Sequence, residues 1–291
     1  MSEFLQQIPS MDLVLGIAVL ISGSIGVVLG RRGGHFRGLP GWAGFWLGFA
    51  GLLITLALAP RWASFILLAG LMFAQIRVYF FVAPVRPSDR WAILAAYLAI
   101  PLVLYPAYLG KTGMFMAAVP VLLFLSIPVL VAIGPRSEGL LDSMGRTLLG
   151  TWFFVFCTAH LGLLAHKPAG QIELYGVLVL AAELPRRLIG PVRPGWPRYR
   201  VVLGVVGSLL VAGAAGLWLG ESCGLVEEDG ARAGLLVALT VAGAGIVSHA
   251  VARDLEVKGA SGYVGRPAFL DRAMTAVYAA PVYYHYLDYF A

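Results

Sequence analysis

The sequence predicts an all-α fold, a polytopic integral membrane bundle of about nine or ten transmembrane helices, in a single domain over residues 1–291. Hydrophobic residues make up 59% of the chain and charged residues 12%, with a mean hydropathy of +0.84. This composition leaves too little polar surface to cover a soluble protein of this size. The apolar residues form continuous runs, which favours helices because transmembrane barrel strands alternate apolar with polar residues. The basic residues gather in alternate loops, as the positive-inside rule requires of a membrane protein.

Ten apolar blocks come close to the length of helix, roughly 20 residues, that crosses the hydrocarbon core of a membrane. In chain order they are residues 12–30, 41–59, 62–82, 91–109, 114–133, 148–166, 171–184, 201–219, 233–251 and 268–291. Glycine clusters in the first and eighth blocks favour close helix packing. Prolines in the fourth and fifth blocks remove backbone donors and are expected to kink those helices. The seventh block is short and the tenth is rich in tyrosine, so these two depart most from a typical span.

The charge distribution indicates the orientation of the bundle. With the N-terminus outside, the cytosolic loops hold 16 of the 21 basic residues, whereas the acidic run of Glu221, Glu227, Glu228 and Asp229 lies outside. The net charge of +6 is then explained by topology and by attraction to anionic headgroups. Nucleic acid is disfavoured as a partner because no soluble basic domain carries the charge. We expect a protein of the bacterial inner (cytoplasmic) membrane, with its basic loops facing the cytosol.

Ionisable side chains within the apolar blocks are functional candidates, because each costs at least about 2.5 kcal/mol at membrane depth. Arg77 lies near the cytosolic end of its block, where it could either snorkel to the interface or hold a lipid phosphate. His160 lies mid-block, where a neutral imidazole hydrogen-bonded to a neighbouring helix is favoured over a catalytic base. Glu183 precedes Arg186 and Arg187, so a local ion pair is favoured over a role in a site.

The C-terminal stretch over residues 248–290 carries the most informative pattern, SHAVARDLEVKGASGYVGRPAFLDRAMTAVYAAPVYYHYLDYF. The residues that carry the pattern are Arg253, Asp254, Leu255, Val257, Lys258, Gly265, Leu270, Asp271, Arg272 and the run Ala279-Ala280-Pro281-Val282. By these residues the chain resembles the phosphatidate cytidylyltransferases, also called CDP-diacylglycerol synthases. Members of that family close with Ser-x-x-Lys-Arg, Lys-Asp, Pro-Gly-His-Gly-Gly and Leu-Asp-Arg-x-Asp before a final apolar helix. The resemblance runs from about residue 70 to the C-terminus.

The resemblance implies transfer of a cytidylyl group from CTP to phosphatidate, with divalent metal held by carboxylates to neutralise the developing charge. It implies Asp271 and Asp254 as catalytic residues, and Asp271 with Glu256 as ligands of Mg²⁺ if the protein is active. No other cofactor is expected. The side chains expected to contact the anionic substrate are those of Arg253, Lys258, Arg266, Arg272, Arg186, Arg187, Arg77 and His160.

The departures from the family pattern remove acids and glycines. Ala252 stands in place of a lysine, Gly259 and Met274 in place of acids, Arg266-Pro267-Ala268 in place of His-Gly-Gly, and Arg186 in place of a carboxylate. A two-cation site is therefore under-supplied with ligands. Arginines can partly replace a cation through bidentate contacts to phosphate, an exchange that preserves binding better than turnover.

Simpler interpretations of the same residues remain open. Asp271 and Arg272 could form an interfacial ion pair that closes the last helix, and Arg253 and Lys258 could belong to a solvated loop that only sets the topology.

The sequence as a whole predicts a cytidylyltransferase-like membrane protein that binds an anionic phospholipid or liponucleotide at the cytosolic face, with catalysis weakened, altered or lost. Expected partners are phosphatidate or CDP-diacylglycerol, CTP, and a second copy or a partner membrane enzyme. The alternative is an active CTP:phosphatidate cytidylyltransferase, in which Asp254 or Glu256 completes the metal site of Asp271. A transporter or scramblase is a third class, favoured by the proline-kinked spans but lacking the paired broken helices and internal repeats of many transporters.

Overall fold

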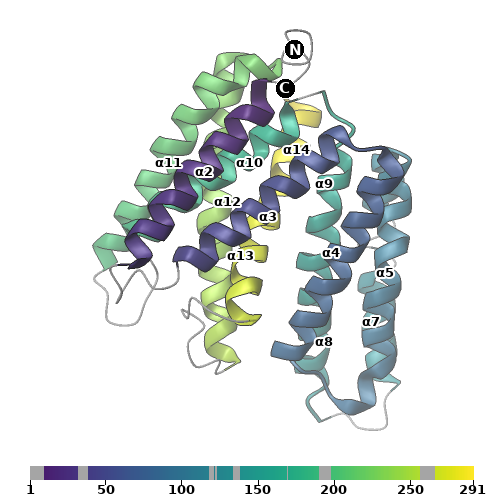
Figure 1. The fold of residues 1–291 in the computed structure, drawn as a ribbon. Coiled ribbons are helices and arrows are strands. Elements are labelled where there is room, and N and C mark those ends of the chain that lie inside the picture. Colours follow the sequence, from purple (N-terminus) through teal and green to yellow (C-terminus); the bar gives the residue numbers. More distant parts are fainter. Residues whose placement is uncertain are drawn as a thin grey trace. The chain divides into compact units, whose positions relative to one another are not determined.

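The structure is a computed structural model that describes residues 10–31, 39–117, 121, 123–133, 138–168, 170–189, 198–255 and 266–291. Every regular element within these ranges is a helix (Figure 1), so the predicted all-α fold is confirmed. The chain divides into two compact units. Unit 1 comprises Met1–Leu58 and Lys167–Ala291, and unit 2 comprises Ala59–His166.

Unit 1 is built around α10. Its elements are α2 (Ser10–Arg31), α3 (Leu39–Leu58), α10 (Gln171–Leu188), α11 (Arg198–Gly220), the 3₁₀ turn η5 (Glu221–Cys223), α12 (Glu227–Asp254), α13 (Arg266–Tyr278) and α14 (Ala280–Tyr289). The helix α10 packs against α2, α3, α11, α12 and α13. Most of its side chains are buried, including the polar Gln171, Glu173, Glu183 and Arg186. The central helix of unit 1 is therefore also the one that carries buried charge.

Unit 2 holds α4 (Arg61–Val82), the 3₁₀ turn η2 (Pro87–Asp89), α5 (Arg90–Tyr108), α6 (Thr112–Ala117), α7 (Phe124–Ala132), α8 (Leu140–Thr151), the π-helix η4 (Trp152–Cys157) and α9 (Thr158–Leu164). The last three elements form one continuous helical segment. Buried Asp89 joins the start of α5 to α8, because its carboxylate accepts hydrogen bonds from both Arg86 and Ser143.

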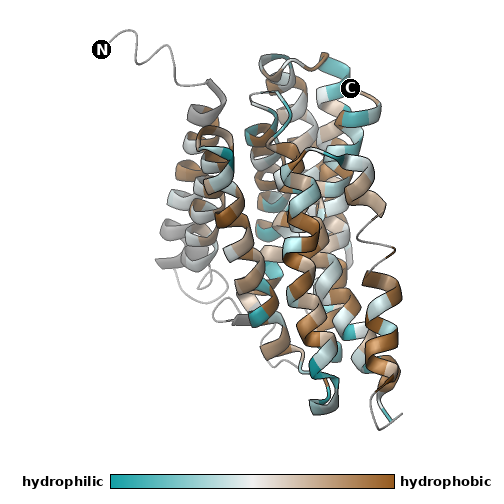
Figure 2. Cartoon of the chain, turned by 90° about the vertical axis from the view of Figure 1, so that its right-hand side faces the viewer, coloured by the Kyte–Doolittle hydropathy of each residue, from teal (hydrophilic) through white to brown (hydrophobic). Residues whose placement is uncertain are grey.

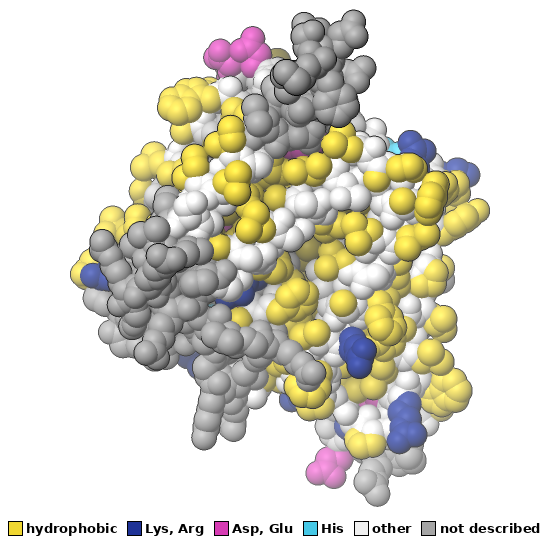
Figure 3. All heavy atoms as spheres, viewed as in Figure 1, with side chains coloured by type: hydrophobic (Ala, Val, Ile, Leu, Met, Phe, Trp, Pro, Cys, Tyr) yellow, Lys and Arg dark blue, Asp and Glu magenta, His cyan; other side chains and the backbone are white. Residues whose placement is uncertain are grey.

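Six helices of the described chain are long and apolar enough to cross a membrane: Gly41–Leu58, Arg61–Val82, Pro87–Tyr108, Leu140–Leu164, Tyr199–Cys223 and Glu227–Asp254. Hydrophobic residues recur along the lengths of the helices (Figure 2), and hydrophobic side chains are spread over the face drawn in Figure 3. Large apolar side chains such as Trp62, Ile66, Leu98, Leu210 and Trp218 are exposed. Water-soluble proteins rarely expose so much apolar surface, and an integral membrane protein exposes it to lipid.

Two predicted spans differ from the observed helices. The block 171–184 was predicted to end before the arginines, but α10 continues to Leu188. The block 268–291 was predicted as one span, but it forms α13 and α14, with a break at Ala279. Pro281 explains the break, because proline cannot donate a backbone hydrogen bond to the preceding turn and is favoured in the first turn of a new helix. The block 114–133 contains α6 and α7, and residues 118–120 and 122 between them lie outside the described ranges.

Glycines bring α11 and α12 into backbone contact. A Cβ atom added to Gly216 would lie 2.0 Å from the carbonyl oxygen of Gly230, and one added to Gly234 would lie 2.1 Å from that of Ala212. Small residues allow this approach because they place little or no side chain between the two helices. The packing role predicted for the glycines of α11 is therefore confirmed at Gly216.

Candidate functional site

Arginines of unit 1 are concentrated at one end of its helices, and acidic residues are more numerous at the other end. The end of α10 meets α13, where Arg187 contacts Asp271, and α13 meets the start of α3, where Arg272 Nη1 donates to the carbonyl of Gly41 at 2.8 Å. We call this end, which holds Arg186, Arg187, Arg253 and Arg272, the basic end.

The other end gathers the acids. There the Tyr286 hydroxyl donates to Asp229 at 3.0 Å, and Lys167 Nζ lies 2.6 Å from Asp288 Oδ1. We call this the acidic end. Its residues are Glu221, Glu227, Glu228, Asp229 and Asp288. The loop asymmetry of the sequence thus corresponds, within unit 1, to two chemically different ends.

Glu183 anchors two arginines at the basic end. Its side chain is 1% exposed, and each of its oxygens accepts from a different guanidinium. Arg186 donates to Oε2 through Nε at 2.9 Å and Nη2 at 2.5 Å, and Arg187 donates to Oε1 through Nε at 3.0 Å. Residues three and four apart on a helix face each other, so the sequence E-L-P-R-R is enough to make these pairs. The ion pair predicted for Glu183 is confirmed.

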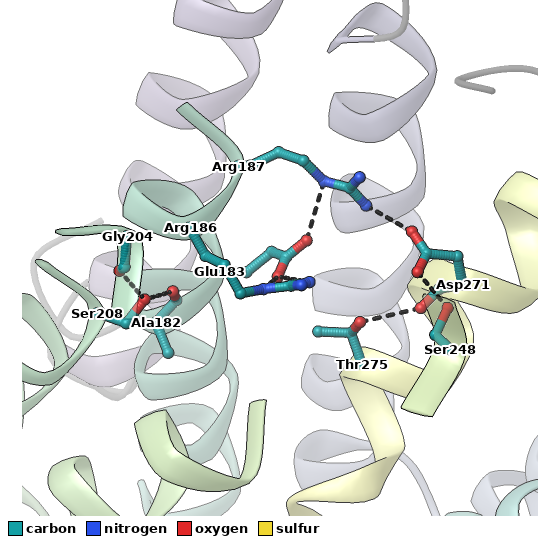
Figure 4. Close-up of polar contacts among 9 residues, drawn as sticks. All are labelled: Ala182, Glu183, Arg186, Arg187, Gly204, Ser208, Ser248, Asp271 and Thr275. Carbon is teal, nitrogen blue, oxygen red and sulfur yellow. Dashed lines mark hydrogen bonds and ion pairs between the residues drawn. The ribbon is translucent and has the colours of Figure 1, made fainter. Parts of the chain in front are cut away.

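Arg187 extends the network to two further helices, as Figure 4 shows. Its Nη2 atom donates to Asp271 Oδ2 of α13 at 2.8 Å. The other oxygen of Asp271, Oδ1, accepts from the hydroxyl of Ser248 of α12 at 2.5 Å. A chain of charge-assisted contacts therefore runs from α10 through α13 to α12. We call Glu183, Arg186, Arg187, Ser248 and Asp271 the arginine cluster.

The position of Arg186 depends on a glycine of α12. A Cβ atom built on Gly245 would lie 1.8 Å from Arg186 Nη1 and 2.6 Å from Cζ. The guanidinium therefore occupies the space that any larger residue at position 245 would fill. On the other side, the Ser208 hydroxyl of α11 donates to the carbonyl of Ala182 at 2.5 Å. Arg186 is thus held, 8% exposed, at the meeting point of three packed helices.

The structure brings together some of the predicted site residues. Asp271, Arg186 and Arg187 are in the arginine cluster, and buried Arg272 follows Asp271 on α13. Arg253 and Asp254 are exposed in the last turn of α12. Glu256, Lys258 and the side chain of Arg266 lie outside the described residues. Ser248 and Gly245 were not among the residues predicted for the site. The available signal was their spacing of three, which places both on one face of a helix.

Arg77 and His160 belong to unit 2. Arg77 is exposed on α4. His160 is fully buried, with Nδ1 2.9 Å from the carbonyl oxygen of Phe156 and its ring edge-on to Phe115 and Phe156 at centroid distances of 4.9 and 4.6 Å. The apolar surroundings of His160 are those of a packed core histidine. The substrate role implied for both residues stays a prediction.

The described part of the basic end does not match a divalent-metal site. No group of three or more His, Cys, Asp and Glu side chains is placed to hold a metal among the residues searched, which are the described ones. The two carboxylates of the arginine cluster, Glu183 and Asp271, are bridged by the guanidinium of Arg187. Glu256, which the family resemblance implies as a second ligand, lies outside the described ranges.

Comparison with known proteins gives one similarity. The chain is 23% identical over 263 residues to a protein of Escherichia coli (strain K12) named "Uncharacterized protein YnbB", and the match covers 84% of this chain and 85% of that protein. No family model matches the chain, and no solved structure matches it.

Proposed function

We propose that this protein is a phosphatidate cytidylyltransferase-like membrane protein that binds an anionic phospholipid or liponucleotide at its basic end, with catalysis weakened, altered or lost. The observation that carries the proposal is the arginine cluster. Ionisable groups buried in membrane proteins usually mark functional sites, and this cluster lies where the family resemblance implies the phosphate-binding residues. Phosphatidate and CDP-diacylglycerol are the ligands that this resemblance implies.

The charge of the basic end supports an anionic ligand. Arg186 and Arg187 pair with Glu183 and Asp271, and buried Arg272, which donates to the carbonyl of Gly41, adds a third guanidinium beside them. Arg187 uses Nε and Nη2 in its two ion pairs, which leaves its Nη1 group without an acceptor among the described residues. A guanidinium presents five N–H donors in a planar fork that suits phosphate oxygens. Exposed Arg253 at the end of α12 adds a further guanidinium, next to the exposed carboxylate of Asp254.

The place of this charge along the helices suits a lipid headgroup. The arginines lie at helix ends, whereas the exposed surface between the two ends is largely apolar. A phospholipid that packs its acyl chains along the apolar surface presents its phosphate at the same level as such end residues. The positive-inside distribution supports a cytosolic position for the basic end, in the leaflet rich in anionic lipid.

Binding of anionic lipid is testable by native mass spectrometry of the protein in mild detergent. We expect phosphatidate and CDP-diacylglycerol to be retained and phosphatidylcholine to be lost. Arg187→Gln should weaken retention of the anionic lipids by roughly tenfold to a hundredfold, because charge-assisted hydrogen bonds contribute about 1.5–3 kcal/mol. The matched control is Arg232→Gln, which removes an exposed arginine paired with Glu228 at the acidic end. Equal losses in both variants, or equal retention of phosphatidylcholine, would contradict the proposal.

Turnover separates this proposal from its alternative, an active CTP:phosphatidate cytidylyltransferase. We expect purified protein with CTP, phosphatidate and Mg²⁺ to release no diphosphate beyond the level of a protein-free control. The reason is that both oxygens of the Asp271 carboxylate are engaged by Arg187 and Ser248. Robust release of diphosphate that is abolished by Asp271→Asn would instead establish the active enzyme.

A further inference from the structure

We propose that the guanidinium of Arg187 takes the place of a divalent cation between Glu183 and Asp271, so that the basic end recognises phosphate without a metal. This inference deepens the proposed function, on which it rests for the identity of the ligand. Whether a metal ion binds between Glu183 and Asp271 can be measured without any lipid.

The geometry of the two carboxylates carries the proposal. Arg187 bridges Glu183 Oε1 and Asp271 Oδ2 at 3.0 and 2.8 Å. The remaining oxygens are also engaged, Glu183 Oε2 by Arg186 and Asp271 Oδ1 by Ser248. Every carboxylate oxygen of the pair therefore accepts from a protein donor. Mg²⁺ requires near-octahedral oxygen coordination at about 2.0–2.1 Å, whereas each oxygen of this pair already gives a lone pair to a protein donor and lies against a guanidinium or a hydroxyl.

Charge balance argues in the same direction. Glu183 and Asp271 are neutralised by Arg186 and Arg187 through ion pairs of 2.5 to 3.0 Å. A divalent ion would therefore give this balanced and largely buried group two surplus positive charges, which is strongly unfavourable where water screens poorly. The guanidinium also remains protonated at all physiological pH values, so its charge is permanent.

The consequence is a specific division of roles among the three arginines. Arg187 acts as the internal cation that holds the two acids together. Arg186 is wedged against Gly245 and tied to Glu183, so it is a positioning residue that fixes the Glu183 carboxylate. The Nη1 group of Arg187, which neither ion pair uses, is then the donor offered to the phosphate, and Arg272 adds a third guanidinium nearby. Binding of phosphatidate should therefore be indifferent to Mg²⁺ and to EDTA.

The test compares the thermal unfolding of detergent-purified wild type and Arg187→Ala during titration with MnCl₂. Wild type should show no Mn²⁺-dependent change. In Arg187→Ala the two acids lose their shared counter-charge, and Mn²⁺ should raise the Tm by about 3 °C or more near saturation, reversibly with EDTA. Arg187→Lys keeps a positive charge and should not respond. The double variant Arg187→Ala/Asp271→Asn should lose the response. Stabilisation of wild type by Mn²⁺, or an Arg187→Ala variant that folds without responding, would overturn the inference.

A second measurement keeps the inference testable if Arg187→Ala does not fold. Wild-type protein is titrated with phosphatidate-containing nanodiscs in 5 mM MgCl₂ or 5 mM EDTA, conditions of about saturating metal and of none. The dissociation constant should agree within about twofold, since no metal links to binding. A loss of more than about tenfold in EDTA would refute the metal-free site. If no phosphatidate binds under either condition, the proposed function fails, while the wild-type Mn²⁺ titration still decides whether a metal site exists.

Discussion

Replacement of Glu183 by alanine is expected to lower the free energy of unfolding by about 3–5 kcal/mol, the cost of leaving a buried charge without its partner. Arg187 would still contact Asp271, but both carboxylate contacts of Arg186 would be lost. Arg186 is 8% exposed and confined by Gly245, so it cannot turn out to solvent without moving α12. The measurement is the Tm and the midpoint of denaturant unfolding in detergent.

The control for this variant removes an acid of the same type from an exposed pair. Glu228 binds Arg232 at 2.7 Å, but the two side chains are 75% and 60% exposed. Glu228→Ala should therefore change stability by no more than about 1 kcal/mol. A compensating variant, Glu183→Ala/Arg186→Met, should regain part of the loss because the unpaired charge is removed with its partner. Similar small costs for Glu183→Ala and Glu228→Ala would show that the arginine cluster does not hold unit 1 together.

The second large effect is expected at the contact of α11 with α12. Gly234→Ala places a Cβ atom 2.1 Å from the carbonyl oxygen of Ala212. The opposing atom belongs to a backbone, so no side-chain rotation relieves the overlap and the two helices must separate. We expect destabilisation of about 1–3 kcal/mol or more, seen as a lower Tm.

Another glycine of α12 supplies the matched control. A Cβ atom on Gly243 would meet its nearest neighbour, Tyr278 Cε1, at 4.0 Å, which is an ordinary contact. Gly243→Ala should therefore be neutral or stabilising by up to about 1 kcal/mol, from the better helix propensity of alanine. If the two variants behaved alike, the close approach of α11 and α12 would be wrong.

Most of the fold was predictable because apolar runs report directly on membrane helices. The failures have specific causes. Hydropathy ended the seventh block at Leu184, because Pro185, Arg186 and Arg187 follow directly. The pairing of Glu183 with Arg186 and Arg187 offsets that charge and lets α10 continue to Leu188. The last block was predicted as one span because its composition is largely apolar. Hydropathy does not register the backbone interruption before Pro281, which divides the block into two helices.

The candidate site was predictable as a set of residues but not as an arrangement. Asp271 and Arg187 were both candidates, yet they are 84 positions apart, and a single sequence holds no information on which distant charges meet. The roles of Ser248 and Gly245 were missed because a hydroxyl and a glycine are unremarkable in a membrane helix until the opposing side chain is known. Arg77 and His160 were grouped with the site through the family resemblance; they belong to unit 2, and their substrate role stays a prediction.

The break at Ala279 divides the end of the chain into two short helices with separate polar contacts. At the acidic end, α14 is held by the hydrogen bond from Tyr286 to Asp229 and by the ion pair of Asp288 with Lys167. At the basic end, Asp271 of α13 forms an ion pair with Arg187 of α10. Loss of the contact between Arg187 and Asp271 would leave α13 held by Arg272 and by the hydroxyl of Tyr175, and it would leave the polar contacts of α14 unchanged. Within unit 1, a change at the basic end therefore acts first on the 13 residues of α13, whereas α14 keeps its contacts at the acidic end.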